Sequence, residues 1–168
     1  MNIKGANLSA LRSPIRTLIA MLALIAAASA PAYAVYNEPG DAAPAGDADF
    51  DAAFSAIKTA DWQTAIGHLE RTVIRHPRSA DVHNLLGFSY RKTGDLDRSF
   101  KHYHRALDLD PEHRGAHEYI GEAWLMQGNA AKARDHLREL ARLCLAECEE
   151  YRILAQAIAD FERGRNPQ

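Results

Sequence analysis

Hydrophobic residues recur at spacings of three and four along most of the chain between residues 50 and 161. This spacing is typical of amphipathic α-helices. The clearest runs are SFKHYHRALDL and AKARDHLRELARL. The pattern predicts an all-α protein with helices near Phe50–Thr59, Trp62–Arg75, Ala80–Thr93, Leu96–Leu109, Arg114–Gln127, Ala130–Leu143 and Cys148–Phe161.

The helical pattern repeats at a constant interval along the chain. Three residue pairs with the same separation define this period: Pro77/Pro111, Gly87/Gly121 and Gly94/Gly128. Glycine at a turn adopts the left-handed backbone that ends a first helix, and proline stops the second helix. Glycine inside a helix is tolerated where it lets a neighbouring helix approach closely. The period predicts an array of helix–turn–helix units.

The repeat resembles the tetratricopeptide repeat. The middle unit, residues 80–113, carries that family's pattern at His83, Leu86, Gly87, Tyr90, Gly94, Ser99, Tyr103, Ala106 and Pro111. The third unit, residues 114–147, matches at His117, Ile120, Gly121, Trp124, Gly128, Ala133 and Leu137, but has Leu145 in place of the closing proline. The first unit, residues 46–79, is degenerate in its first helix and keeps Ala65, Leu69, Thr72 and Pro77.

The resemblance implies a right-handed superhelical solenoid of about three repeats. Residues 148–163 carry Tyr151, Leu154, Ile158 and Phe161 on one helical face, so we expect a C-terminal capping helix there. A solenoid needs such a cap because its last repeat otherwise exposes an apolar face.

Residues 1–34 have the composition of a secretory signal peptide. Lys4, Arg12 and Arg16 precede a continuous apolar run, and an Ala-Tyr-Ala sequence ends at Ala34. This order of segments favours cleavage after Ala34, and the run is shorter than the ~20 residues of a membrane span. We expect a periplasmic or secreted protein from a Gram-negative source, without a membrane span in the mature chain. An uncleaved N-terminal anchor is the alternative.

Two other segments have little to bury. Residues 35–49, VYNEPGDAAPAGDAD, mix proline, glycine, alanine and acidic residues, and we expect a disordered acidic linker there. We also expect a loose tail at residues 164–168.

Composition narrows the function classes. The chain has 168 residues, of which 47% are hydrophobic, enough for one domain with a core. Its formal net charge of −2 shows no basic excess, so we do not expect nucleic-acid binding. We find no phosphate-binding loop, G-x-S-x-G, H-E-x-x-H or C-x-x-C-H motif, and therefore predict neither an enzyme nor a cofactor.

Cys144 and Cys148 lie where the third repeat lacks its closing proline. In an unbroken helix this spacing has poor geometry for a disulfide, but at a helix–turn–helix junction the bond is feasible. An oxidising compartment favours it. We predict a disulfide that fastens the cap to the preceding helix; a redox or metal-binding thiol pair is the alternative. The C-x-x-x-C-E-E-Y ending also resembles that of short exported bacterial repeat proteins.

Five of the eight histidines follow the repeat, as His68/His102/His136 and His83/His117. Equivalent positions on successive repeats should lie on the order of 10 Å apart, too far to share one metal ion. His113 and His117 stand one helical turn apart and are the remaining candidate half-site. We assign no metal ligand.

The first helices of the repeats should line a concave binding face. On the family's register its inward positions are Phe50, Phe54, Ile57, Lys58, Asn84, Phe88, Arg91, Lys92, Glu118, Glu122, Leu125 and Met126. We expect apolar pockets at the aromatic and aliphatic positions. Lys58, Arg91 and Lys92 should form a basic cluster for an acidic side chain or a C-terminal carboxylate. Some members of the family bind carboxylates through a specific pattern of residues. We do not expect this function here, because Asn84 stands one position away from the asparagine of that pattern.

The sequence therefore predicts an exported, non-enzymatic adaptor or scaffold that binds a peptide or helix of an envelope protein in its groove. One alternative is a thiol-redox or metal-binding accessory protein that uses Cys144 and Cys148. The other is a self-assembling homo-oligomeric module, with the degenerate first repeat leaving an apolar end open.

Overall fold

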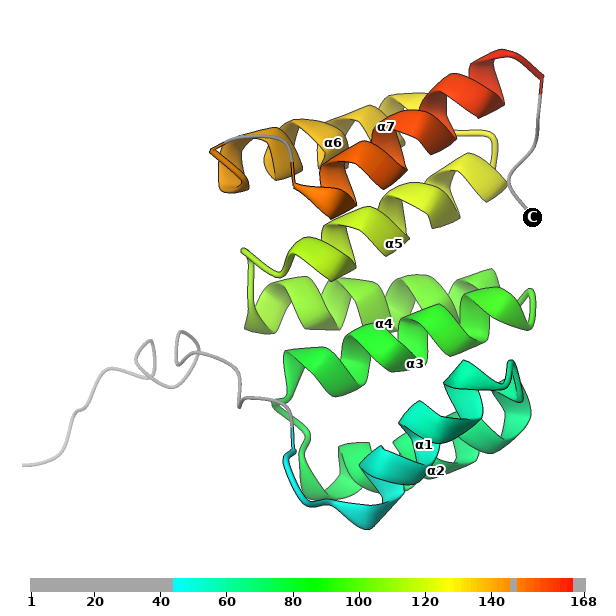
Figure 1. Cartoon of the computed structure of the whole chain (residues 1–168), viewed down its shortest axis with the longest axis vertical. Coiled ribbons are helices and arrows are strands. Elements are labelled where there is room, and N and C mark those ends of the chain that lie inside the picture. The colour runs from blue at the N-terminus through cyan, green and yellow to red at the C-terminus, as the bar shows by residue number, and fades with distance from the viewer. Residues whose placement is uncertain (1–43, 146–147, 165–168) are drawn as a thin grey trace, which may run out of the picture. The chain divides into compact units, whose positions relative to one another are not determined.

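The computed structural model describes residues 44–145 and 148–164. Within these residues the chain forms seven α-helices and no strand (Figure 1). The helices are α1 (Ala48–Lys58), α2 (Trp62–Arg75), α3 (Ala80–Lys92), α4 (Leu96–Leu109), α5 (Arg114–Met126), α6 (Ala130–Leu143) and α7 (Glu149–Glu162). The all-α prediction is confirmed, and the predicted helix boundaries lie close to the observed ones.

The helices are arranged as successive pairs. α1 packs on α2, α3 on α4 and α5 on α6, and the second helix of each pair contacts the first helix of the next. Figure 1 shows the pairs stacked in chain order, with α7 lying over α5 and α6. This is an all-α helical solenoid, and Leu154 and Ile158 of α7 are buried in its last core cluster.

Turn chemistry sets the helix boundaries. Asp61, Ser79, Asp95 and Asn129 precede α2, α3, α4 and α6, and each side chain accepts a hydrogen bond from a backbone N–H of the first turn. Such caps satisfy donors that have no partner within the helix. Gly94 and Gly128 adopt φ angles of +83° and +76° in the turns after α3 and α5. Ala60 holds the equivalent turn position after α1, with φ +57°.

Two helical glycines let neighbouring helices approach closely. A Cβ atom on Gly87 would lie 2.5 Å from Cδ1 of Tyr103, and one on Gly121 would lie 2.6 Å from Cδ2 of Leu154. Both neighbouring side chains are fully buried. The missing side chains therefore make room for a tyrosine ring of α4 and for a leucine of the cap.

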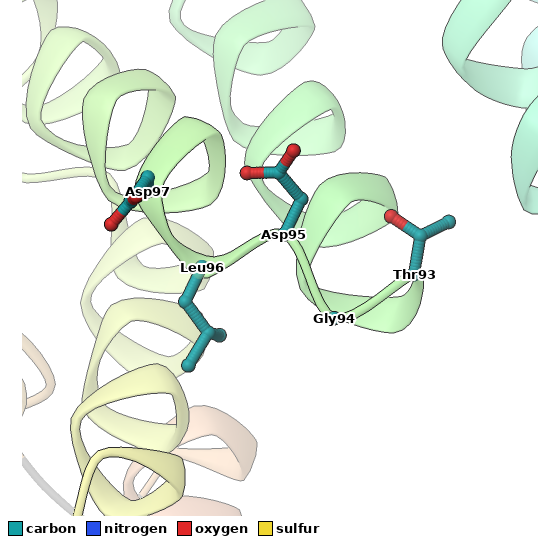
Figure 2. Close-up of a pocket in the computed structure, with 5 residues that line it drawn as sticks. All are labelled: Thr93, Gly94, Asp95, Leu96 and Asp97. Carbon is teal, nitrogen blue, oxygen red and sulfur yellow. The ribbon is translucent and has the colours of Figure 1, made fainter.

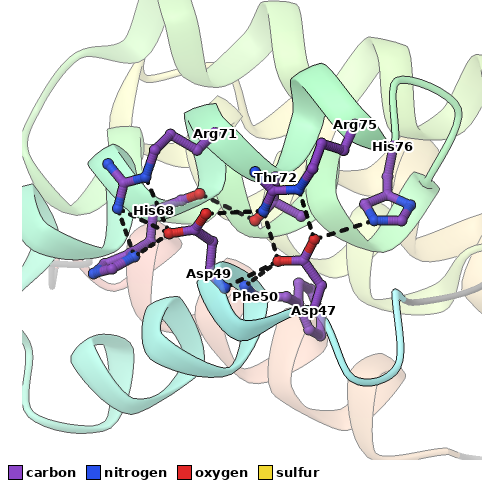
Figure 3. A network of polar contacts seen from close by, with 8 residues as sticks. All are labelled: Asp47, Asp49, Phe50, His68, Arg71, Thr72, Arg75 and His76. Atoms are coloured by element: carbon purple, nitrogen blue, oxygen red, sulfur yellow. Dashed lines mark hydrogen bonds and ion pairs between the residues drawn. The ribbon is translucent and has the colours of Figure 1, made fainter.

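The predicted linker is wrong for its last residues, because α1 already begins at Ala48. Asp47 caps this helix by accepting hydrogen bonds from the backbone N–H groups of Asp49 and Phe50, both at 3.0 Å. Arg75 of α2 donates to both carboxylate oxygens of Asp47, at 2.8 and 2.9 Å (Figure 3). These ion pairs hold the pKa of Asp47 well below its usual range.

Residues 1–43, 146–147 and 165–168 lie outside the described residues. The predicted signal peptide, the earlier part of the predicted linker and most of the predicted tail fall there. In the remainder of the chain, no helix combines the length and the apolar character needed to cross a bilayer.

Candidate binding surface

A strip of aromatic rings runs from the start of α2 across α3 and α5, the first helices of the second and third repeats. Phe88 of α3 packs against Trp62 of α2, with ring centroids 5.6 Å apart, and against Tyr119 of α5 at 4.9 Å. All three side chains are half-buried, so part of each ring faces solvent. Tyr119 was not among the predicted groove residues, although it stands one position after Glu118 and its ring continues the strip.

Arg91 lies beneath this strip and is not a free cation. Its side chain is 5% exposed and pairs with Glu122, with Nη2 and Oε2 2.6 Å apart. Its Nε donates to the hydroxyl of Tyr103 at 3.4 Å, and its guanidinium carbon lies 5.5 Å from the ring centroid of Phe88. The predicted basic cluster of Lys58, Arg91 and Lys92 is therefore wrong in one member, since the charge of Arg91 is neutralised within the fold.

The two lysines remain exposed beside aromatic rings. The Nζ of Lys58 lies 4.7 Å from the ring centroid of Phe54, and that of Lys92 lies 5.9 Å from Phe88. Phe54 is 46% exposed and Met126 is 37% exposed. The surface thus pairs solvent-facing apolar groups with cations on α1 and α3.

Carboxylates occupy the α5 and α7 side of the surface. Glu118 is 6% exposed, and its burial together with the nearby charges of Glu122 and Glu150 raises its pKa to about 7. Glu149 acts on Glu118 in the same direction. Asn84 is buried at the equivalent position of α3, and its Oδ1 has no hydrogen-bond partner among the described residues.

Three other predicted groove residues have core positions instead. Leu125 is fully buried in the cluster beneath α7, so its predicted role in partner binding is wrong. Phe50 and Ile57 are partly buried against the first core cluster. The family register marks a helix face, but the depth of each residue depends on which helix packs over it.

A shallow depression of about 540 Å³ lies at the turn between α3 and α4 (Figure 2). It is lined by Thr93, Gly94, Asp95, Leu96 and Asp97. Its polar groups serve the turn itself: the hydroxyl of Thr93 donates to the carbonyl of Tyr90 at 2.9 Å, and Asp95 caps α4. It is therefore not a candidate binding site.

Comparison with protein-family models adds a match to the tetratricopeptide repeat over residues 50–101 and 87–144. The chain belongs to the tetratricopeptide repeat family. Repeats of this family form protein–protein interaction modules, which are in general non-enzymatic scaffolds. A comparison with curated proteins finds no match.

The last tetratricopeptide repeat joins its cap through a disulfide. Cys144 follows α6 and Cys148 precedes α7, and the two residues are bonded with their Cα atoms 5.6 Å apart. The bond stands where the repeat lacks its closing proline, as predicted. Leu145 follows Cys144 with φ +50° and is almost entirely exposed.

The histidines of the tetratricopeptide repeats form pairs that sequence reasoning missed. His83 lies against His102, and His117 against His136, each pair joining the two helices of one repeat. Histidines at equivalent positions of successive repeats are the ones that sequence reasoning compares, and the pairs lie within single repeats instead. The signal that could have found them is that His83 and His102 have the same sequence separation as His117 and His136. His113 does not pair with His117; it faces Asp81 and accepts a hydrogen bond from the backbone of Ala116.

Proposed function

We propose that this tetratricopeptide-repeat protein is an exported adaptor that binds a peptide or helical segment of another envelope protein across the first helices of its repeats. The observation that carries the proposal is the aromatic strip of Trp62, Phe88 and Tyr119, together with the exposed Phe54 of α1 and Met126 of α5. Half-buried rings lined up across several repeats supply rigid apolar contact area at low entropic cost, as protein interfaces do.

The charges on this surface suggest the chemistry of the partner. Lys58 and Lys92 are exposed on α1 and α3, whereas Glu149 and Glu150 of α7 lie near Glu118 of α5. A segment that crosses the helices in this order meets cations first and carboxylates afterwards. We infer a partner segment with acidic residues at one end, apolar anchors in its middle and basic residues at the other end, because complementary charges set its direction of binding.

Export rests on the sequence of residues 1–34. The protein is then periplasmic or secreted, and the mature chain begins at Val35. Edman sequencing of the protein from envelope fractions tests this part independently. Val35 at the N-terminus supports cleavage after Ala34, whereas Met1 in a membrane fraction supports the uncleaved anchor.

A charge-reversal experiment tests the binding surface. Affinity capture from envelope extract with the full chain is compared with capture by a Lys58→Glu/Lys92→Glu variant. Both lysines are exposed, so this variant keeps the fold. A partner held by the parent and lost by the variant supports the proposal.

The matched control is Ile74→Glu, because Ile74 is 79% exposed on α2, a second helix. Capture that is lost with Ile74→Glu but retained with the lysine variant would place the interface elsewhere and overturn the proposal.

A further inference from the structure

Two pairs of histidines join the two helices of the second and third repeats. The Nδ1 atoms of His83 on α3 and His102 on α4 lie 3.1 Å apart, and those of His117 on α5 and His136 on α6 lie 3.0 Å apart. The ring centroids within the pairs are 5.4 and 5.3 Å apart, so the Nδ1 edges face each other. Each contact therefore has the geometry of an N–H···N hydrogen bond between the helices of one repeat.

A single hydrogen lies between the facing nitrogens of each pair. The Nε2 of His83 lies 3.2 Å from the carbonyl oxygen of Pro77, and that of His117 lies 3.0 Å from the carbonyl oxygen of Pro111. A carbonyl oxygen only accepts, so each Nε2 carries a hydrogen and donates it. The Nδ1 of these neutral rings is then an acceptor, and the histidine on the second helix of each repeat donates the hydrogen from its own Nδ1.

Acid supplies more protons than this contact has room for. A first proton goes to the outer Nε2 of His102, which leaves the shared hydrogen in place. A second proton goes to the Nδ1 of His83, and two N–H groups of two charged rings then point at each other. The same holds for His136 and His117. The closed pair thus binds at most one proton, whereas two free histidines bind two once the pH is well below about 6.5.

The surroundings of the first pair oppose even the first proton. His83 is 8% exposed, and His102 is half-buried with its ring stacked on Tyr90, the centroids 5.6 Å apart. Burial lowers the pKa of His83 and lowers that of His102 to about 4. The charged groups that act on this pair are three cations of α4 and one carboxylate of α2, namely Arg98, Lys101, Arg105 and Glu70. The cations outnumber the carboxylate, so the local field also disfavours a charged ring.

Burial dominates at the second pair as well. It lowers the pKa of His136 to about 4, and the neighbouring His117 acts in the same direction. The other titratable groups that act on this pair come from α4 and α6, namely His104, Lys132, Asp135 and Glu139. Charges of both signs are present here, so the burial of the rings and their mutual contact decide the direction.

We propose that the two pairs are acid-sensitive latches, which hold the helices of the second and third repeats together near neutral pH and release them in mild acid. The open state binds more protons than the closed state, so the free energy of unfolding falls as the pH falls below about 6.5. With a pKa of about 4 in the fold against 6.5 in the open chain, His102 and His136 alone should raise the unfolding equilibrium constant roughly 10²–10³-fold between pH 7.5 and pH 5.

The first repeat has a different contact at the same place. Asp49 and His68 occupy the positions equivalent to His83 and His102, and their side chains lie 2.8 Å apart (Figure 3). A carboxylate accepts a hydrogen bond from a neutral or a charged histidine, and its attraction to the charged ring is the stronger. Protonation of His68 therefore preserves this contact, and the latch is a property of the second and third repeats.

Urea denaturation of the full chain at a series of pH values tests the proposal. The slope of the logarithm of the unfolding constant against pH gives the number of protons taken up on unfolding. His102→Gln/His136→Gln keeps an N–H donor for each facing Nδ1 but cannot be protonated. Groups elsewhere in the chain contribute equally to both proteins. At pH 5 the double variant should take up about two protons fewer than the parent.

The matched control is His104→Gln, which removes an exposed histidine from α4 and should leave the proton uptake unchanged. An uptake by the double variant equal to that of the parent would overturn the proposal, as would a loss of two protons in the control.

A second measurement does not depend on the variants folding. Imidazole ¹⁵N NMR of the parent at pH 7.5 should show the Nε2–H tautomer for His83 and His117 and the Nδ1–H tautomer for His102 and His136. The latter two rings should stay neutral in the folded protein down to pH 5. Nε2–H tautomers in all four rings, or titration of His102 and His136 near pH 6.5 in the folded protein, would overturn the proposal.

Discussion

Arg91 of α3 and Glu122 of α5 form an ion pair in which Nη2 and Oε2 are 2.6 Å apart, and this pair joins two successive repeats beneath the aromatic strip. A charge on the binding face of one repeat is thus neutralised by the next repeat. The guanidinium carbon lies 5.5 Å from the ring centroid of Phe88 and 5.8 Å from that of Tyr119, so the pair lies against both rings.

Arg91→Ala should therefore destabilise the fold. Removal of one partner leaves the carboxylate of Glu122 largely buried without its cation, which costs roughly 2–4 kcal/mol. Urea denaturation measures this loss. Lys92→Ala is the matched control on the same helix and should change the free energy of unfolding by less than about 0.5 kcal/mol. Equal losses in the two variants would show that the ion pair contributes nothing specific.

Gly87→Ala should destabilise the second repeat. The added methyl group would lie 2.5 Å from the ring of the fully buried Tyr103, closer than a Cβ atom can approach without a shift of its neighbour. Overpacking of this kind costs about 1–3 kcal/mol. Gly67→Ala in α2 is the control, because its nearest neighbour is a side-chain nitrogen of Arg71 at 3.9 Å. The control should gain about 0.5–1 kcal/mol from helix propensity, and thermal unfolding that ranks the two variants the other way would contradict the packing argument.

Ala60→Gly should stabilise the protein. Ala60 adopts φ +57° in the turn where the next two repeats have Gly94 and Gly128. A left-handed backbone costs an alanine roughly 1–2 kcal/mol, and the greater chain entropy of the unfolded glycine variant offsets part of the gain. We expect a net gain of up to about 1 kcal/mol by chemical denaturation. The reciprocal change Gly94→Ala has open space around the new methyl group and should lose a similar amount through backbone strain alone.

Glu118 should make stability fall as the pH rises. Its pKa is about 7 in the fold against an ordinary value of 4.5, so the folded state binds more protons than the unfolded state between these values. The contribution of Glu118 to the free energy of unfolding is therefore largest below about pH 4.5 and is lost as the pH rises to about 7. Glu118→Gln should have a higher Tm than the parent at pH 8, and this gain should shrink towards pH 5. A difference that does not change with pH would show that Glu118 does not titrate in this range.

The fold was largely predictable because the same helix–turn–helix pattern occurs several times along the sequence. The glycine and proline positions that define the period are also the positions where helices end or approach closely, as Gly87 and Gly94 show. The binding surface was less predictable, because the helix face on which a residue stands does not determine how deeply its side chain is buried. Leu125 stands on the predicted face, yet it is buried in the cluster that α7 completes.

The ion pairs between residues far apart in the sequence could not be predicted from the helical pattern either. Asp47 and Asp49 lie in a segment with a linker-like composition, but their partners Arg71 and Arg75 are far along the chain, on α2. The ion pair of Arg91 is of the same kind. The local sequence around each of these charged residues is compatible with a solvent-exposed side chain. The side chain is paired only because another helix packs against its own.

Site-specific photo-crosslinking in cells tests the central claim most directly. A photoreactive amino acid replaces Phe54 or Met126 on the proposed binding surface, and Ile74 on α2 as the exposed control. We predict a shared protein adduct at Phe54 and Met126 and no such adduct at Ile74. An adduct formed equally at Ile74, or at Ile74 alone, would contradict binding across the first helices of the repeats.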